Sequence, residues 1–290
     1  MSAQDALALE PPTPDDRTRG RPNPSLLVGG LIVCTVIGMA LLSFVWTPHD
    51  PTLVNATARL QKPSAEYWFG TDKFGRDVFS QILVGSRTTL FVGFVAVGVA
   101  ALIGVPLGIL AGMAPRWFGE LLMRGNDVLL AFPALLLAIM FAAVYGASTL
   151  VAMVAIGIAT IPSFARLIRS GTLQVMGTEY VLAARAAGRR PFAIGLRHVL
   201  PNVSSLVTVQ ASVGFAIAVL AEAALSFLGF GTPPPTPSWG RMLQESQEML
   251  YTAPRLAVFP GVAIALAVLG FNLLGDGLRD HFDPKLEDRR

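Results

Sequence analysis

The segment "TTLFVGFVAVGVAALIGVPLGILAGMA", residues 88–114, has no charged side chain in 27 consecutive positions. A helix needs about 20 apolar residues to cross a bilayer core about 30 Å thick. Four other long uncharged runs occur, at residues 25–46, 128–165, 203–221 and 256–275. Because buried strands do not reach such lengths, the sequence predicts an all-α integral membrane protein. Its 14% of charged residues agrees with this, since soluble domains carry roughly 25%.

The run at residues 128–165 is too long for one membrane span. The turn-prone residues "YGAS", 145–148, lie at its middle, so we expect two helices joined by a tight turn. The first of these helices would extend back over Leu121–Met123 to reach spanning length. The sequence therefore predicts six transmembrane helices.

Six spans place both chain ends on one side of the membrane. If that side is the cytoplasm, 15 of the 22 Lys and Arg residues lie in cytoplasmic segments. The positive-inside rule favours this threading, so we expect a multi-pass plasma (inner) membrane protein with both termini cytoplasmic. The expected segments are a flexible polar tail (1–24), a first helix (25–46), an extracytoplasmic segment (47–87), a five-helix core (88–280) and a second cytoplasmic tail (281–290).

Two of the expected extracytoplasmic segments have distinctive patterns. In "FGTDKFGRDVFSQILVGSR", residues 69–87, apolar side chains recur at helical spacing opposite polar ones, which predicts a short helix lying in the membrane interface. Residues 231–255 open with "GTPPPTPSWG", whose prolines forbid a helix and favour a stiff extended strap.

Four residues within the spans are candidates for gating or for packing. Gly104, Gly108 and Gly112 share one helix face and would let a neighbouring helix approach closely. This face is either a moving joint or a static packing seam, and the second interpretation needs fewer assumptions. Glu222 lies near the end of its span, where a hydrogen-bonded cap or a contact with substrate could hold its carboxylate.

The sequence lacks the motifs of an enzyme that would drive transport by itself. It contains no GxxxxGK[ST] phosphate loop, no HExxH and no GxSxG, and its three histidines are scattered. We therefore expect no metal, cofactor or nucleic acid on this chain. The energy for any transport has to come from an ion gradient or from another protein.

The window "EYVLAARAAGRRPFAIGLRHVLPN", residues 179–202, carries four arginines between two apolar runs. Glu179–Ala187 favours a helix, Gly188 is a natural stop, and Pro191 suits the first turn of a second short helix that Leu200-Pro201 would end. The product is a bent, arginine-edged knuckle within a cytoplasmic loop, residues 170–202. Its periodicity fits docking into a protein groove or contact with anionic lipid equally well.

This window resembles the cytoplasmic loop of ABC importer permeases, which has the pattern EAA-x3-G-x9-I-x-LP. Ala183-Ala184, Gly188 and Leu200-Pro201 fall at its spacings, while Leu182 stands in place of Glu and His198 in place of Ile. The "RHVLPN" ending is similar to the oligopeptide/dipeptide (and nickel) branch. So are three further blocks, "FGTDKFGRDVFSQILVGSR", "EAALSFLGFGTPPPTPSWG" and "FNLLGDGLRDHFDPKL", which resemble the second permease subunit of that branch.

The resemblance implies a type I ABC importer permease fold and a transport subunit without its own ATPase site. It implies a second homologous permease, two ATP-binding subunits that hold ATP and Mg, an extracytoplasmic peptide-binding protein, and oligopeptides or dipeptides as substrate. The residues it assigns to ATPase docking are Glu179, Ala183, Ala184, Arg185, Gly188, His198, Leu200, Pro201 and Asn202. Nickel or another small solute is the alternative substrate, and a gradient-driven secondary transporter is the alternative class.

Overall fold

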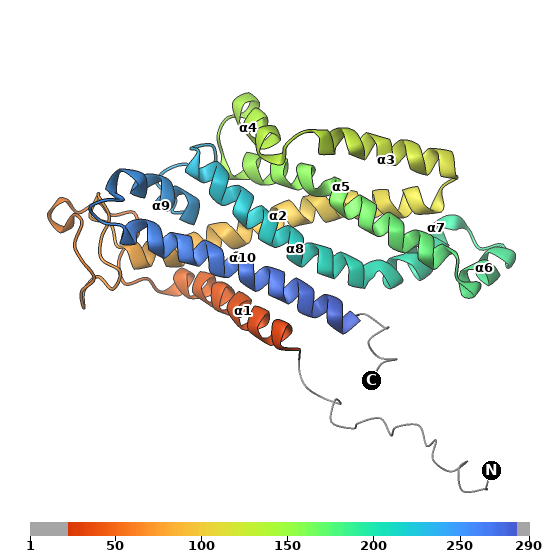
Figure 1. Ribbon diagram of the computed structural model, residues 1–290, viewed down its shortest axis with the longest axis horizontal. Helices are drawn as coiled ribbons and strands as arrows, with labels where there is room; N and C mark the ends of the chain where they lie inside the picture. The colour runs from red at the N-terminus through yellow and green to blue at the C-terminus, as the bar shows by residue number, and fades with distance from the viewer. Residues whose placement is uncertain (1–22, 283–290) are drawn as a thin grey trace, which may run out of the picture.

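Helices dominate the computed structural model, which describes residues 23–282 (Figure 1). Within that range the chain forms ten α-helices and no β-strand. The helices are α1 (Pro24–Val45), α2 (Val78–Met113), α3 (Arg116–Ala131), α4 (Ala134–Tyr145), α5 (Thr149–Met176), α6 (Glu179–Ala186), α7 (Pro191–Ile194), α8 (Leu200–Phe227), α9 (Trp239–Ser246) and α10 (Arg255–Phe282). Short 3₁₀ turns occur at Ala56–Ala58 and Gln247–Met249, and a π turn at Gly195–Val199. The all-α fold class is confirmed, whereas the predicted tails lie almost entirely outside the described residues.

Five of the described helical segments are long and apolar enough to cross a membrane: α1, α2, α5, the continuous stretch 191–227, and α10. A sixth segment qualifies only if α3 and α4, which bend by 78° at their junction, are counted together. The single helix predicted here, extended back over Leu121–Met123, is instead a bent pair of helices. Pro133 disfavours a helical conformation at Phe132, whose backbone is extended, so the span breaks there. The turn predicted at residues 145–148 is present between α4 and α5.

The predicted interfacial helix does not form as a separate element. Residues 78–87 are the first turns of α2, a 36-residue helix that begins at Val78, and residues 69–77 before it are not helical. Asp77 caps this helix, since its carboxylate accepts the backbone N–H of Ser80 at 2.9 Å. The apolar side chains of Ile82 and Leu83 are 5% and 2% exposed. They are buried against protein, so the periodicity that suggested an interface reflects a buried helix face.

The predicted helix stop at Leu200-Pro201 is also wrong. The chain is helical from Pro191 to Phe227, and Pro201 lies in the first turn of α8. The N–H of Leu200 bonds to the carbonyl of Gly195 across the π turn, which shifts the hydrogen-bond register just before the proline. A residue in the first turn of a helix needs no N–H donor, so Pro201 is tolerated there and the helix continues through it.

The three-glycine face of α2 packs against α5. A Cβ on Gly104 would lie 2.6 Å from the Phe164 Cβ, one on Gly108 2.6 Å from the Ala165 carbonyl oxygen, and one on Gly112 2.6 Å from the Thr172 Cγ2. Only hydrogen fits at these distances, so the two helices touch along three turns. The contacts are those of a close-packed seam, and movement along it stays a prediction.

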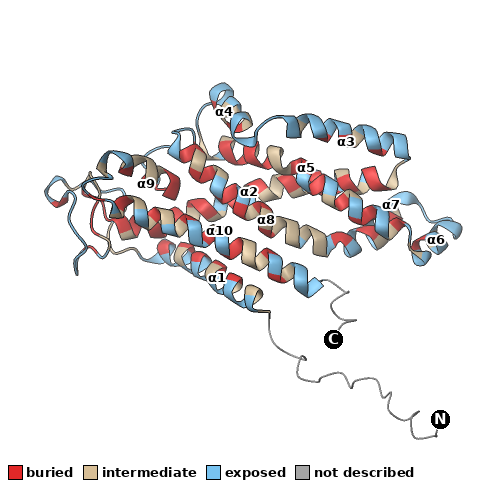
Figure 2. Ribbon diagram, viewed as in Figure 1, coloured by how far each residue is buried: buried red, intermediate tan, exposed pale blue. Residues whose placement is uncertain are grey.

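The remaining spans surround this pair. Helix α8 lies against both α2 and α5, and α10 and α1 follow it outward, while α3 and α4 cover the opposite side of α5 (Figure 1). Buried residues concentrate on α2, α5 and α8, whereas much of α3 and α1 is exposed (Figure 2). The side-chain amide of Asn23 donates to Asp280 at 2.9 Å, so both described ends of the chain lie on one side of the bundle.

The seam predicts a specific sensitivity to added volume. Gly108→Val should destabilise the protein by about 1–3 kcal/mol, because the new side chain cannot fit against α5. Gly98→Val is the matched control on the same helix, since no atom lies within 4 Å of a Cβ at Gly98. The melting temperature of each detergent-purified variant is measured by heating the protein and determining, by size-exclusion chromatography, the fraction that stays folded. Equal melting temperatures for the two variants would show that the seam tolerates a side chain.

Candidate functional site

The knuckle, residues 179–199, is shaped by one glycine and one proline. Helix α6 ends where Gly188 adopts a φ of +75°, a left-handed conformation that side chains disfavour. The N–H of Gly188 then bonds to the Arg185 carbonyl at 2.9 Å, and that of Arg189 to the Ala184 carbonyl at 3.1 Å. Pro191 begins α7. The predicted helix, stop and second helix start are therefore confirmed.

Three apolar side chains anchor the knuckle to the bundle. Val181, Ile194 and Val199 are at most 2% exposed and belong to one cluster with Phe164 and Ile168 of α5. The ends of α2, α5 and α8 meet in this cluster, so the knuckle is packed onto all three helices. Any displacement of the knuckle has to move these helix ends with it.

The outward surface of the knuckle combines apolar and basic side chains. Phe192 is 78% exposed, and Leu182, Leu196 and Tyr180 are about half exposed. Four arginines surround them: Arg185, Arg189, Arg190 and Arg197. Within residues 23–282, none of the four forms an ion pair. This surface therefore suits a partner with an apolar groove and acidic edges.

The structure divides the predicted docking residues between two elements. Glu179, Ala183, Arg185 and Gly188 are exposed on or next to α6, and Ala184 beside them is half-buried. Leu200, Pro201 and Asn202 are exposed at the start of α8, where the Asn202 amide donates to the carbonyl of half-buried His198 at 2.7 Å. Sequence analysis missed Phe192 and Leu196. Their signal was a large apolar residue in a short, strongly basic segment.

Glu222 lies near the end of α8 and is 2% exposed. Its Oε1 accepts the hydroxyl of Ser226 at 2.6 Å and that of Thr232 at 3.3 Å. The carboxylate thus joins the helix end to the proline-rich segment that follows. These contacts fit the hydrogen-bonded cap, and a contact of Glu222 with substrate stays a prediction.

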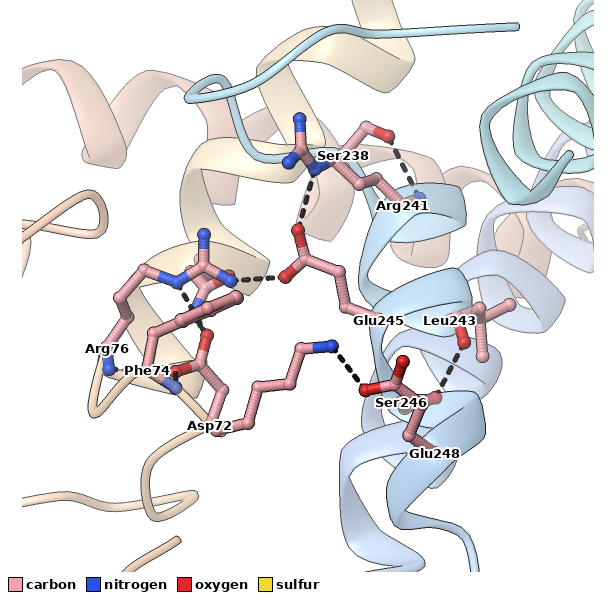
Figure 3. Close-up of polar contacts among 11 residues, drawn as sticks. Asp72, Phe74, Arg76, Ser238, Arg241, Leu243, Glu245, Ser246 and Glu248 are labelled. Atoms are coloured by element: carbon pink, nitrogen blue, oxygen red, sulfur yellow. Dashed lines mark hydrogen bonds and ion pairs between the residues drawn. The ribbon is translucent and has the colours of Figure 1, made fainter. Parts of the chain in front are cut away.

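At the end of the bundle opposite the knuckle, residues 46–77 and 228–254 form a cap. A chain of alternating charges joins its two segments (Figure 3). Arg76 donates to Asp72 at 2.6 Å and also to Glu245, which accepts from Arg241 at 2.8 Å. Arg76 is 8% exposed. Because removal of one partner would leave a buried charge uncompensated, this chain of charges holds the two segments together.

Three further contacts reinforce the cap. The half-buried Lys73 pairs with the exposed Glu248 at 2.8 Å, and this hydrogen bond lowers the pKa of the Glu248 carboxyl below its usual value. Arg255 donates to the backbone carbonyls of residues 60 and 61 at 3.0 and 2.8 Å. The indole N–H of Trp239, which is 1% exposed, donates to the Ile82 carbonyl at 3.0 Å. The predicted extended strap therefore ends at residue 238 and is followed by a buried helix, α9, that sequence analysis did not foresee.

No group of three or more His, Cys, Asp or Glu side chains in the described range is arranged to hold a metal ion.

A family model described as "binding-protein-dependent transport system inner membrane component" matches residues 104–288 of this chain. The chain is 44% identical over 265 residues to the dipeptide transport system permease protein DppC of Alkalihalophilus pseudofirmus, a match that covers 91% of this chain and 87% of the relative. It is 43% identical over 262 residues to the glutathione transport system permease protein GsiD of Pectobacterium atrosepticum, covering 90% and 87%.

The fold also has a counterpart among solved structures. A chain of the inward-facing MetNI methionine ABC transporter superposes with a TM-score of 0.59, covering 70% of this chain and 97% of that one at 19% sequence identity. At this identity the match concerns the fold, and it confirms the expected type I permease architecture.

The cap predicts a contrast between two of its basic residues. Arg76→Gln should destabilise the protein by about 2–3 kcal/mol, because Glu245 and Asp72 lose a nearly buried partner. Lys73→Gln removes an equal charge from a pair whose carboxylate, Glu248, is 68% exposed, and should have little effect. Thermal unfolding measures the stability of both variants, and limited proteolysis between residues 46 and 77 measures how well this segment of the cap is held. Equal protease resistance of the Arg76 variant and the unchanged protein would contradict a structural role for the buried ion pairs.

Proposed function

We propose that this chain, which belongs to the family of binding-protein-dependent transport system inner membrane components, is a permease subunit of an ATP-driven importer of short peptides. The observation that carries the proposal is the knuckle, a rigidly anchored surface with exposed apolar side chains and arginines that form no ion pair within residues 23–282. The similarity to dipeptide and glutathione permeases supports a peptide or peptide-like substrate. The chain does not hydrolyse ATP itself; ATP and Mg are bound by partner subunits.

The knuckle couples ATP hydrolysis to movement of the spans. Leu182 and Phe192 enter an apolar groove on an ATP-binding subunit, and the arginines pair with acidic residues at its rim. When two such subunits close on ATP, they displace this knuckle and the corresponding loop of a second permease. The cluster around Ile168 transmits the displacement to α2, α5 and α8. These helices then reorient as a body, as expected of alternating access.

Leu182 changes one contact expected for this loop. The loop pattern has Glu at this position, whereas Leu182 is 50% exposed and apolar. An apolar contact therefore replaces a charged one, while the four arginines preserve electrostatic attraction to the ATP-binding subunit.

The cap contacts a peptide-binding protein that delivers substrate. Its ion pairs hold a firm platform, and the large side chains of Leu53, Val54 and Tyr251 project from it, each more than 60% exposed. The binding protein is extracytoplasmic, so the cap faces outward, and the knuckle and both termini face the cytoplasm of a cell with this subunit in its inner membrane.

A second, homologous permease completes the pathway. Helices α3 and α4 expose many large apolar side chains and have α5 behind them, so this side suits another apolar protein surface. The translocation pathway then lies between the two chains, and this chain alone is inactive.

The left-handed turn of the knuckle offers a test of coupling. Gly188→Pro should abolish uptake, because proline cannot adopt a φ of +75° and the direction of α7 would change. Gly177→Ala is the control in the same region, since a Cβ there meets its neighbours at ordinary distances of 3.5 Å or more. Uptake and membrane content are measured in the same cells. Full uptake by the Gly188 variant, at normal membrane content, would contradict coupling through the knuckle.

A purification tests the class of transporter and its substrate together. Affinity purification of the tagged chain from native membranes in mild detergent should recover a second six-span chain and one or two ATP-binding chains, identified by mass spectrometry. A dipeptide presented with its binding protein should stimulate ATP hydrolysis in reconstituted vesicles, whereas Ni²⁺ should not. Recovery of this chain alone, with solute uptake driven by an ion gradient, would establish a secondary transporter instead.

A further inference from the structure

An apolar groove of about 420 Å³ lies on the surface of the bundle next to α1. Four helices contribute to it: α1, α2, α8 and α10. Its lining residues are Ile37, Leu90, Phe91, Phe94, Phe215 and Phe271. All six are apolar, and four are phenylalanines.

The floor of the groove is held in place by ring packing. The Phe215 ring lies directly over Gly93, where a Cβ would come within 2.2 Å of it. Phe215 also stacks on Phe271, with ring centroids 4.0 Å apart. The Phe91 and Phe94 rings, by contrast, are 55% and 77% exposed and form an open wall. The groove is therefore a preformed feature with one side open to its surroundings.

One cation lies in line with this groove. Residues 87, 90, 91 and 94 share a face of α2, so Arg87 is about 10 Å along the helix from Phe94, toward the cap. Arg87 also reaches α1, where its Nε donates to the Ser43 hydroxyl at 2.5 Å and a terminal nitrogen donates to the Ser43 carbonyl. Its guanidinium stacks on the Phe44 ring at 3.9 Å.

The charge of Arg87 has no counterpart among the residues that the structure describes. None of the ion pairs in residues 23–282 involves it, and both of its hydrogen-bond acceptors are neutral. An arginine has five N–H donors, so further donors remain available. Ser43 is two residues from the end of α1, which places the guanidinium at the depth where a span meets the membrane surface.

We propose that this groove binds a phospholipid of the leaflet on the cap side. The phosphate accepts hydrogen bonds from Arg87, whose planar guanidinium matches phosphate oxygens, and one acyl chain lies across Phe91, Phe94 and Ile37. A cation next to an apolar groove is complementary to a phospholipid, whose phosphate is joined to an apolar acyl chain. Few other molecules in a membrane combine these two groups. The inference does not depend on which solute the protein transports.

A photoreactive phospholipid tests this site in the intact assembly. The tagged chain, purified with its associated subunits, is placed in nanodiscs of phosphatidylethanolamine and phosphatidylglycerol that contain a trace of phosphatidylglycerol with a diazirine in one acyl chain. After illumination, mass spectrometry should locate adducts at Phe91 and Phe94. Arg87→Gln should reduce these adducts about tenfold, the ratio expected from loss of one charge-assisted hydrogen bond, and Arg87→Lys should reduce them less.

Controls separate a lipid site from general membrane exposure. Labelling at Leu102, which lies on the same helix and is 78% exposed, should be the same in all variants. Since loss of Arg87 also loosens the contact between α1 and α2, Phe94→Trp provides a second variant that fills the groove and leaves the cation in place. It should reduce adducts at Phe91 as well. A diazirine fatty alcohol, which has no phosphate, should label the groove no more than it labels Leu102.

Two results would overturn the proposal. Adducts at Phe91 that are unchanged by both Arg87→Gln and Phe94→Trp would mean that acyl chains contact this face without a specific site. Absence of lipid adducts, combined with crosslinks from a photoreactive amino acid at position 94 to an associated subunit, would mean that a protein surface covers the groove.

Discussion

The close contact between α2 and α5 is the constraint on which the rest of the structure depends. Along Gly104, Gly108 and Gly112 the two backbones approach so closely that no side chain fits between them. Apolar side chains gain little by moving from lipid to protein, so membrane helices associate through such close packing and through buried polar contacts. The seam places the ends of α2 and α5 at one site, where the knuckle can pack onto both.

Helix α2 connects the two ends of the molecule. It begins at Val78, two residues after the Arg76 ion pairs of the cap, and ends at Met113 beside the knuckle. One helix of 36 residues spans this distance, and its interior lacks one backbone hydrogen bond where Pro106 has no N–H. Under the proposed function, this geometry lets an event at the knuckle reach the cap directly. The buried charges of the cap then keep its two segments together while the bundle reorients.

Local signals in the sequence were sufficient where one residue type dictates one backbone conformation. Gly188 ends α6 and Pro191 begins α7, as predicted, because each satisfies a conformational requirement that depends on its immediate neighbours. Predictions failed where a distant contact outweighed a local signal. Leu200-Pro201 did not end a helix because the π turn before it accommodates the proline, and residues 78–87 joined α2 because α9 buries their apolar face.

The sequence by itself determined the membrane class, the approximate spans and the knuckle, because uncharged length and helix-breaking residues act locally. Its motifs were enough to indicate the family of permeases. Only the tertiary structure decided which partners the charges of the cap have, since Arg76 and Glu245 are 169 positions apart in the chain. It also decided that Phe192 is exposed and Val181 buried, and that phenylalanines from α2, α8 and α10 line one groove. These properties depend on which helices become neighbours, and the periodicity within one helix does not specify its neighbours.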